Sequence, residues 1–188
     1  MKPVLTVICA CMCSIFHEQF SPVIPSHPAS IPLDTIQWSA GYKLTFSDFQ
    51  EEKQHYTGTT FDTTKFTVLA YSAVFISFVP RLEGKQLLFD AFASFVRHKS
   101  WMLHQQQGVL QHEQGHFDIA AIYARRLKKA LQRFQDPTLP GVKDSVYKVY
   151  NEIIALNKKE QEDYDYTSLT PIGREYYYKK IAEGLREE

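Results

Sequence analysis

The sequence predicts a single α+β domain in which short antiparallel strands are followed by two long helices. Segments rich in β-branched and aromatic residues fill the chain from about residue 35 to residue 96, and such residues favour strands. Runs of helix-forming residues occupy the part after residue 107. Strands grouped before helices are typical of the α+β class, and 188 residues with 44% apolar side chains suffice for one core.

The first 33 residues predict a targeting segment and a linker. Residues 1–20 hold Lys2, the apolar run Val4–Phe16 and all three cysteines, as in a secretory signal peptide. Ile-Cys-Ala-Cys at 8–11 also resembles a lipobox, in which Cys11 would carry a lipid anchor; a buried N-terminal strand is the alternative. Residues 21–33 contain four prolines and are expected to be a linker. The domain would then span 34–188 of an exported protein that is periplasmic, extracellular or lipid-anchored in the cell envelope.

The strands are expected in three segments. Thr35–Phe46 predicts a strand or a short hairpin, and Ser47–Phe49 can open a helical turn. Residues 61–79 alternate in part and predict two antiparallel strands that end in a turn at Pro80–Lys85. Gln86–Val96 fits a strand or a helix, and its alternating bulky residues favour the strand.

Two helices are expected to follow. Residues 108–134 contain no proline and one internal glycine, which predicts one long helix with Ser100 as a candidate cap. A turn at Gln135–Gly141 leads to a second helix capped by Asp144 or Ser145. The apolar stripe of that helix is Val146, Val149, Tyr150, Ile153 and Leu156. Because the connection is short, the two helices should pack antiparallel.

The charge pattern does not suggest a nucleic-acid partner. Lys plus Arg equals Asp plus Glu, at 21 each. The one basic cluster, at 125–129, lies on the half of the first helix that is expected to be exposed.

A His-Glu-x-x-His motif lies in the first long helix, at residues 112–116. Residues four apart share one helix face, so His112 and His116 can bind one zinc ion. Glu113 lies about 100° around the helix, where a carboxylate can accept a proton as general base without occupying a ligand position. The alternative is a pair of hydrogen-bonded core histidines. His98 and His104 lack ligand spacing and are expected at the surface or beside the site.

The third ligand is expected on the second helix. If the turn between the helices is centred near Thr138, the two histidines face residues around 161–165. The carboxylates there are Glu160, Glu162, Asp163 and Asp165, of which Glu160, Glu162 and Asp165 are the candidate ligands. Extending the apolar stripe by helical spacing buries Glu160 and Tyr164, which favours Glu160. The alternative is a solvated acidic helix end.

Several segments together resemble a bacterial family of uncharacterised proteins labelled predicted secreted zinc-dependent proteases. They are Trp38, Lys43–Phe49, Ser100-Trp101, Leu110–Asp118, Ala124–Leu127 and Tyr164-Asp165. The resemblance covers roughly residues 36–181. It implies a zincin-like fold, with a small, mainly antiparallel sheet packed on the His-Glu-x-x-His helix. It also implies that His112 and His116 are ligands, that Glu113 is the base and that Tyr164-Asp165 belongs to the site, which places the third ligand on Asp165.

The sequence departs from this family at one point. A His-Gly pair often follows the Tyr-Asp in the family, whereas Thr167–Gly173 keeps a glycine and has no histidine. If that histidine serves the metal elsewhere, this chain binds the metal differently or is inactive.

The function expected from these residues is zinc-dependent hydrolysis of a peptide or protein substrate. Zinc on three protein ligands would keep a fourth position for water. Glu113 would accept the proton, and Tyr164 or Tyr166 would donate to the developing oxyanion, with Tyr164 preferred. The alternatives are a non-catalytic envelope protein with a structural metal site and an inactive zincin-like binding module.

Overall fold

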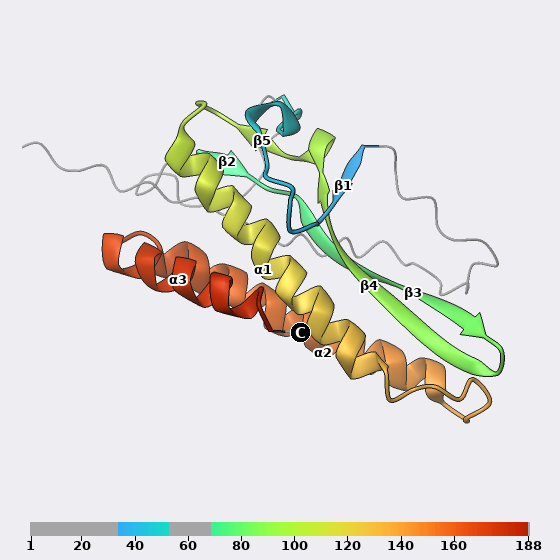
Figure 1. Cartoon of the computed structure of the whole chain (residues 1–188). Coiled ribbons are helices and arrows are strands. Elements are labelled where there is room, and N and C mark those ends of the chain that lie inside the picture. The colour runs from blue at the N-terminus through green and yellow to red at the C-terminus, as the bar shows by residue number, and fades with distance from the viewer. Residues whose placement is uncertain (1–33, 53–68, 188) are drawn as a thin grey trace, which may run out of the picture.

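The computed structural model describes residues 34–52 and 69–187 and shows an α+β fold with antiparallel strands beside three helices (Figure 1). The strands are β1 (Thr35–Gln37), β2 (Ala70–Tyr71), β3 (Val74–Glu83), β4 (Gln86–Val96) and β5 (Trp101–Met102). The helices are α1 (Gln107–Leu131), α2 (Val142–Thr167) and α3 (Pro171–Gly184), with 3-10 turns at Phe46–Asp48 and Arg97–Lys99. In the described part of the chain, no helix has the length and apolar character that crossing a membrane would require.

The main sheet is a long hairpin of β3 and β4, extended at one end by β1 in the order β1-β4-β3. The predicted strand Gln86–Val96 is confirmed with the same bounds. The predicted turn at Pro80 is wrong, because β3 continues to Glu83 and Pro80 pairs with Phe89. Pro80 is tolerated there because β3 is an edge strand, where a missing N–H need not cost a ladder hydrogen bond. The chain reverses at Gly84, whose φ of 61° suits a glycine.

The two strands predicted between 61 and 79 can be compared with the structure only from residue 69 on, because residues 61–68 lie outside the described residues. In the described part, β2 pairs with β5 in a separate two-stranded sheet. The partner of β3 is β4, with Val74 opposite Phe95. Strand structure is therefore confirmed for the described part of this segment.

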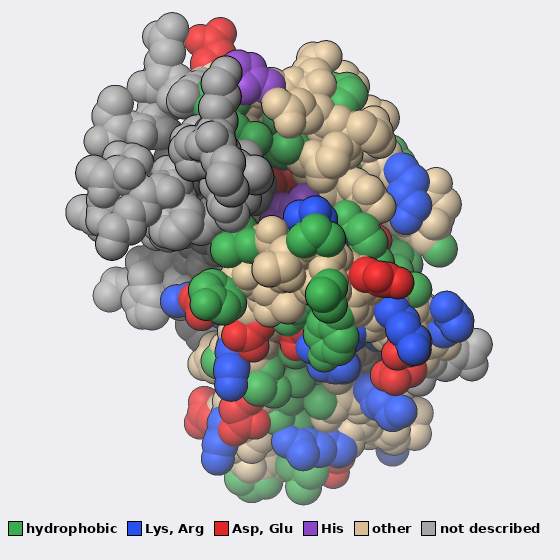
Figure 2. Space-filling model, turned by 90° about the vertical axis from the view of Figure 1, so that its left-hand side faces the viewer, with side chains coloured by type: hydrophobic (Ala, Val, Ile, Leu, Met, Phe, Trp, Pro, Cys, Tyr) green, Lys and Arg blue, Asp and Glu red, His purple; other side chains and the backbone are tan. Residues whose placement is uncertain are grey.

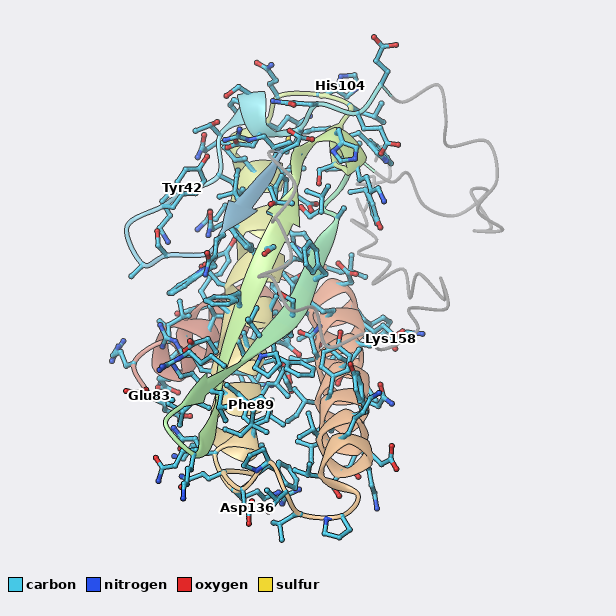
Figure 3. The ribbon with its side chains drawn as sticks, turned by 90° about the vertical axis from the view of Figure 1, so that its right-hand side faces the viewer. Tyr42, Glu83, Phe89, His104, Asp136 and Lys158 are labelled. Atoms are coloured by element: carbon cyan, nitrogen blue, oxygen red, sulfur yellow. The ribbon has the colours of Figure 1, made fainter. Side chains whose placement is uncertain are left out.

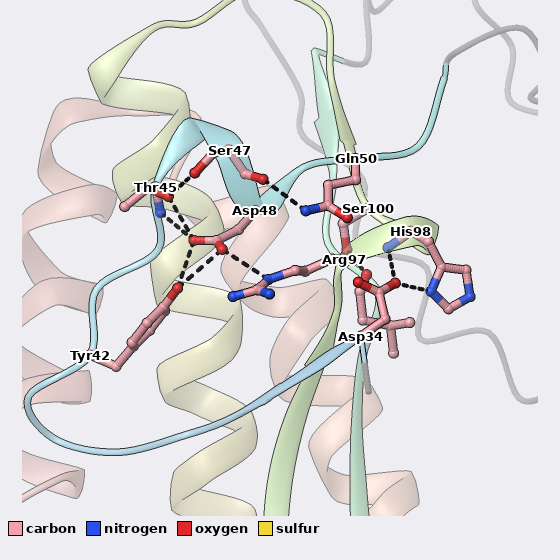
Figure 4. Close-up of polar contacts among 10 residues, drawn as sticks. Asp34, Tyr42, Thr45, Ser47, Asp48, Gln50, Arg97, His98 and Ser100 are labelled. Carbon is pink, nitrogen blue, oxygen red and sulfur yellow. Dashed lines mark hydrogen bonds and ion pairs between the residues drawn. The ribbon is translucent and has the colours of Figure 1, made fainter. Parts of the chain in front are cut away.

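The segment Thr35–Phe46 is a strand only over its first three residues. Beyond β1 the backbone leaves the sheet and is held by the Asp48 carboxylate (Figure 4). That buried carboxylate accepts the Tyr42 hydroxyl (2.9 Å), the Thr45 N–H (2.8 Å) and Arg97 Nε (3.1 Å). Because these bonds take the place of strand pairing, a loop forms where the composition predicted a strand or a short hairpin. The helical turn expected at Ser47–Phe49 is found as a 3-10 turn at Phe46–Asp48.

The core lies between α1 and the sheet. Figure 3 shows the hairpin lying across α1, with α2 and α3 on either side of that helix. Phe117 of α1 is fully buried and meets Phe95 of β4 with ring centroids 5.9 Å apart. α1 is buried along most of its first half, as its composition predicted. Its ends differ slightly from the predicted 108–134.

The predicted helix caps are wrong. Ser100 lies well before α1, and its hydroxyl donates to the Val96 carbonyl at 2.7 Å while accepting the Ala73 N–H at 2.9 Å, so it joins β strands instead. α2 begins after Gly141, whose φ of 74° sets the start of the helix before Asp144 and Ser145.

The buried face of α2 changes character along its length. Val146 and Val149 are buried as predicted, whereas Leu156 is 53% exposed. After that point the buried positions are Asn157, Gln161, Tyr164 and Ser168. The second half of α2 therefore turns polar and aromatic side chains toward α1, at the level of the histidine motif.

α3 was not predicted. Thr170 caps it by accepting the Gly173 N–H at 3.0 Å, and Pro171 opens its first turn. Tyr177 and Ile181 bury its inner face. These start signals are present in the sequence, but the apolar period of α3 is weak, because apolar residues such as Ile172 and Tyr176 also lie on its exposed side.

Candidate metal site

The two histidines of α1 and one carboxylate of α2 meet at one point. His112 Nε2 and His116 Nε2 lie 3.1 Å apart, and Asp165 Oδ1 lies 3.0 Å from each. Within the described residues, this is the one group of three or more His, Cys, Asp or Glu side chains arranged to hold a metal ion. The antiparallel helix pair thus brings together residues about 50 positions apart in the chain, as the pairing argument expected.

The other two candidate carboxylates are directed elsewhere. Glu160 binds Lys180 of α3 at 2.5 Å, and Glu162 is exposed and lies 3.9 Å from Lys158. Glu160, which the helical-stripe argument favoured, is therefore not brought to the histidines. Asp165 reaches the histidines because it sits in the last turn of α2, on the side of the helix that faces α1.

The donor set and its spacing fit one zinc ion. Two ligands of a tetrahedral zinc lie about 3.3 Å apart when the bonds are about 2.0–2.1 Å long. The three atoms here are 3.0–3.1 Å apart. Two imidazole nitrogens and one carboxylate oxygen are also the ligand types of hydrolytic zinc sites. The spacing and the chemistry of these residues therefore suit zinc.

The site is mostly buried. His116 is fully buried, while the side chains of His112 and Asp165 are each 13% exposed. Figure 2 shows that little histidine surface (purple) is exposed on the face that it presents. Burial alone would raise the pKa of Asp165, but the charges and hydrogen bonds of His116 and His112 outweigh it and lower that pKa to about 2.

Tyr164 packs against both histidines. Its ring stacks on His112 with centroids 4.5 Å apart and an interplanar angle of 11°, and it meets His116 edge-on at 4.9 Å. Its hydroxyl donates to the His112 carbonyl at 3.2 Å. Burial is the main reason that the pKa of this hydroxyl is raised, with Glu113 among the charges that add to it. The sequence predicted that this hydroxyl would donate to a developing oxyanion, whereas in the structure it donates to a backbone carbonyl of α1.

Glu113 is fully buried in α1, one residue after the first histidine.

The fourth residue of the motif, Gly115, leaves room for Tyr164: a Cβ there would collide with the Tyr164 hydroxyl and lie 2.6 Å from Tyr164 Cζ. The glycine is therefore needed for the close approach of α2 to the histidines.

Sequence reasoning missed the side chains behind the histidines. Gln161 Oε1 lies 2.6 Å from His116 Nδ1, and Ser168 Oγ lies 3.3 Å from His112 Nδ1. Both come from α2, at helical spacing on either side of Tyr164-Asp165. The sequence does hold a signal for them: each is a polar residue at a position where the apolar stripe of α2 would continue by helical spacing.

The remaining candidates lie away from this cluster. His98 is exposed and pairs with Asp34. His104 is exposed in the loop before α1. Asp136 binds the Thr138 N–H and hydroxyl in the turn between α1 and α2.

Comparison with known proteins gives one match. Residues 97–170 match the model of a family described as "Bacterial protein of unknown function (DUF922)". No curated protein and no solved structure matches the chain. The match agrees with the resemblance to an uncharacterised bacterial family. It contains both helices that build the cluster, and its description states no activity.

Proposed function

We propose that this protein is a zinc-dependent hydrolase that cleaves peptide or related amide bonds. The observation that carries the proposal is the triangle of His112 Nε2, His116 Nε2 and Asp165 Oδ1, with sides of 3.0–3.1 Å. Structural zinc sites have four protein ligands, whereas catalytic sites have three and an open position. Three candidate ligands in the described part of the chain favour catalysis over a purely structural metal.

A bound zinc ion would supply Lewis acidity, which lowers the pKa of water and polarises a carbonyl group. The protein residues would supply the rest of the chemistry. The two imidazoles and Asp165 would hold the ion. Glu113, adjacent to the first ligand, would accept a proton from water and pass it to the leaving amine.

Tyr164 fits a positioning role better than an oxyanion donor, because its hydroxyl is bonded to the His112 carbonyl and its ring lies against both imidazoles. Tyr166, the other tyrosine considered, follows Asp165 in the sequence and is 79% exposed. A zincin-like arrangement is part of the proposal, supported by a His-Glu-x-x-His helix that packs beside an antiparallel sheet.

The test begins with zinc stoichiometry in the purified full chain. The parent is expected to bind about one zinc per chain, and His112→Ala, His116→Ala and Asp165→Asn are expected to lose it. Glu160→Gln is the matched control on the same helix, because that carboxylate pairs with Lys180. A parent that binds no zinc after reconstitution would contradict the site.

Activity is tested separately with Glu113→Gln on a peptide library. This variant is expected to keep zinc and to lose cleavage by about two orders of magnitude or more, the usual contribution of a general base. If the parent binds zinc and cleaves no peptide, the non-catalytic envelope protein becomes the better description.

A further inference from the structure

We propose that Gln161 is a positioning residue that fixes the tautomer of His116, so that Nε2 is the nitrogen offered to the metal. This inference rests on the proposed zinc site and deepens it. It concerns a residue of α2 that is neither a ligand nor a proton carrier.

The contacts of Gln161 allow one orientation of its amide. Its side chain is fully buried, with Nε2 lying 3.0 Å from the His116 carbonyl and 3.3 Å from Asn157 Oδ1, while Oε1 lies 2.6 Å from His116 Nδ1. A backbone carbonyl can only accept hydrogen bonds, so the group facing it must be the amide nitrogen. The amide oxygen must then face the imidazole.

The orientation of the amide decides the tautomer of the imidazole. Because Oε1 can only accept, His116 Nδ1 must carry the hydrogen. In the neutral ring the lone pair then lies on Nε2. That lone pair faces the Asp165 carboxylate at 3.0 Å and His112 Nε2 at 3.1 Å. Acceptor atoms this close repel one another unless a proton or a metal ion lies between them, so the arrangement can hold a positive ion.

The same helix supports the other histidine. Ser168 Oγ lies 3.3 Å from His112 Nδ1, and Tyr164 stacks on the ring. In both histidines a side chain of α2 contacts Nδ1 and leaves Nε2 for Asp165. The hydrogen bond that His116 Nδ1 donates to Gln161 Oε1 is shorter than the contact of Ser168 with His112 and is fully buried. Its loss should therefore have the larger effect on zinc affinity.

The first experiment needs neither zinc nor activity. The side-chain nitrogens of His116 are observed by ¹⁵N NMR in the metal-free full chain, at a pH well above the ordinary histidine pKa of about 6.5. The expected result is the Nδ1–H tautomer. A neutral His116 protonated at Nε2 in the parent would overturn the proposal, whatever the protein does with zinc.

The second experiment measures zinc affinity by chelator competition. Gln161→Leu is expected to bind zinc about 10–100-fold more weakly, the usual effect of removing the hydrogen-bond partner of a ligating histidine. Val149→Ala is the matched control, since it removes buried volume from the same helix away from the site and should leave zinc affinity unchanged.

Gln161→Glu distinguishes orientation from simple packing. A carboxylate still accepts from Nδ1–H but cannot donate to the His116 carbonyl, so this variant should keep the tautomer and recover part of the affinity that the Leu variant loses. Equal losses in the Glu and Leu variants, or parental affinity in a folded Leu variant, would overturn the inference. The zinc stoichiometry of the parent tests the proposed function independently of these results.

Discussion

Gly115 is predicted to be the position of α1 least able to accept a side chain. A Cβ there would collide with the Tyr164 hydroxyl and lie 2.6 Å from Cζ and 2.9 Å from Cε1. Tyr164 is fully buried between His112, His116 and Tyr177, so its ring cannot move aside without disturbing its neighbours. Gly115→Ala should therefore push α2 away from the histidines, and Asp165 with it.

The change in the free energy of unfolding of Gly115→Ala is the sum of opposing contributions. Overpacking in a core costs about 1–3 kcal/mol, and loss of the hydroxyl bond to His112 costs about 1 kcal/mol. Alanine in place of glycine within a helix returns about 1 kcal/mol. The net loss of about 1–3 kcal/mol corresponds to a melting temperature lower by about 3–9 °C for a chain of this size.

Thermal unfolding of the metal-free protein measures this loss of stability. Chelator competition measures zinc affinity, which should fall at least about tenfold because the ligand geometry is disturbed. Gly108→Ala is the matched control, because it lies in the same helix with nothing within 4 Å of its Cβ position. That variant should be unchanged or slightly more stable. If Gly115→Ala behaves like Gly108→Ala in both measurements, the argument from the close approach of Tyr164 is refuted.

Three further predictions concern other parts of the molecule. Gly173→Ala should destabilise the protein by about 1–3 kcal/mol in urea unfolding, because its Cβ would collide with the Thr167 carbonyl; Gly41→Ala, with open space around it, should not. Zinc affinity should fall in acid, since protons compete with the metal for an imidazole nitrogen; Asp165, with a pKa of about 2, stays ionised, so unchanged affinity at pH 5 would contradict histidine ligation. Mass spectrometry of protein from its native host should show a chain shortened near residue 20 or lipidated at Cys11, and an intact Met1 in the cytosol would contradict export.

The sequence predicted the helix pair and the cluster because both depend on local spacing. The i, i+4 spacing places His112 and His116 on one face whatever the rest of the chain does. A short connection makes α2 antiparallel, so chain length alone brings Asp165 near them. The choice of Asp165 over Glu160 rested on the resemblance to a family, since helical spacing favoured Glu160, which the structure pairs with Lys180.

The parts that were mispredicted depend on contacts between distant residues. The loop after β1 forms because Arg97 and Tyr42 converge on Asp48, a contact that no local pattern contains. Pro80 predicts the end of a strand because proline cannot donate a ladder hydrogen bond. The structure places it on an edge strand, where proline is tolerated, and the strand order that decides this is not visible in the local sequence. The caps were misplaced because Ser100 is used between strands and Gly141 starts α2 instead.

The second half of α2 explains why the site and the family match coincide. Gln161, Tyr164, Asp165 and Ser168 replace the apolar stripe with polar and aromatic side chains, each of which contacts a histidine of α1. Buried polar groups cost stability unless each finds a partner. Four such side chains against one motif support the metal site proposed above. Both helices lie within residues 97–170, so the matched segment contains the complete set of residues proposed to hold and orient the metal.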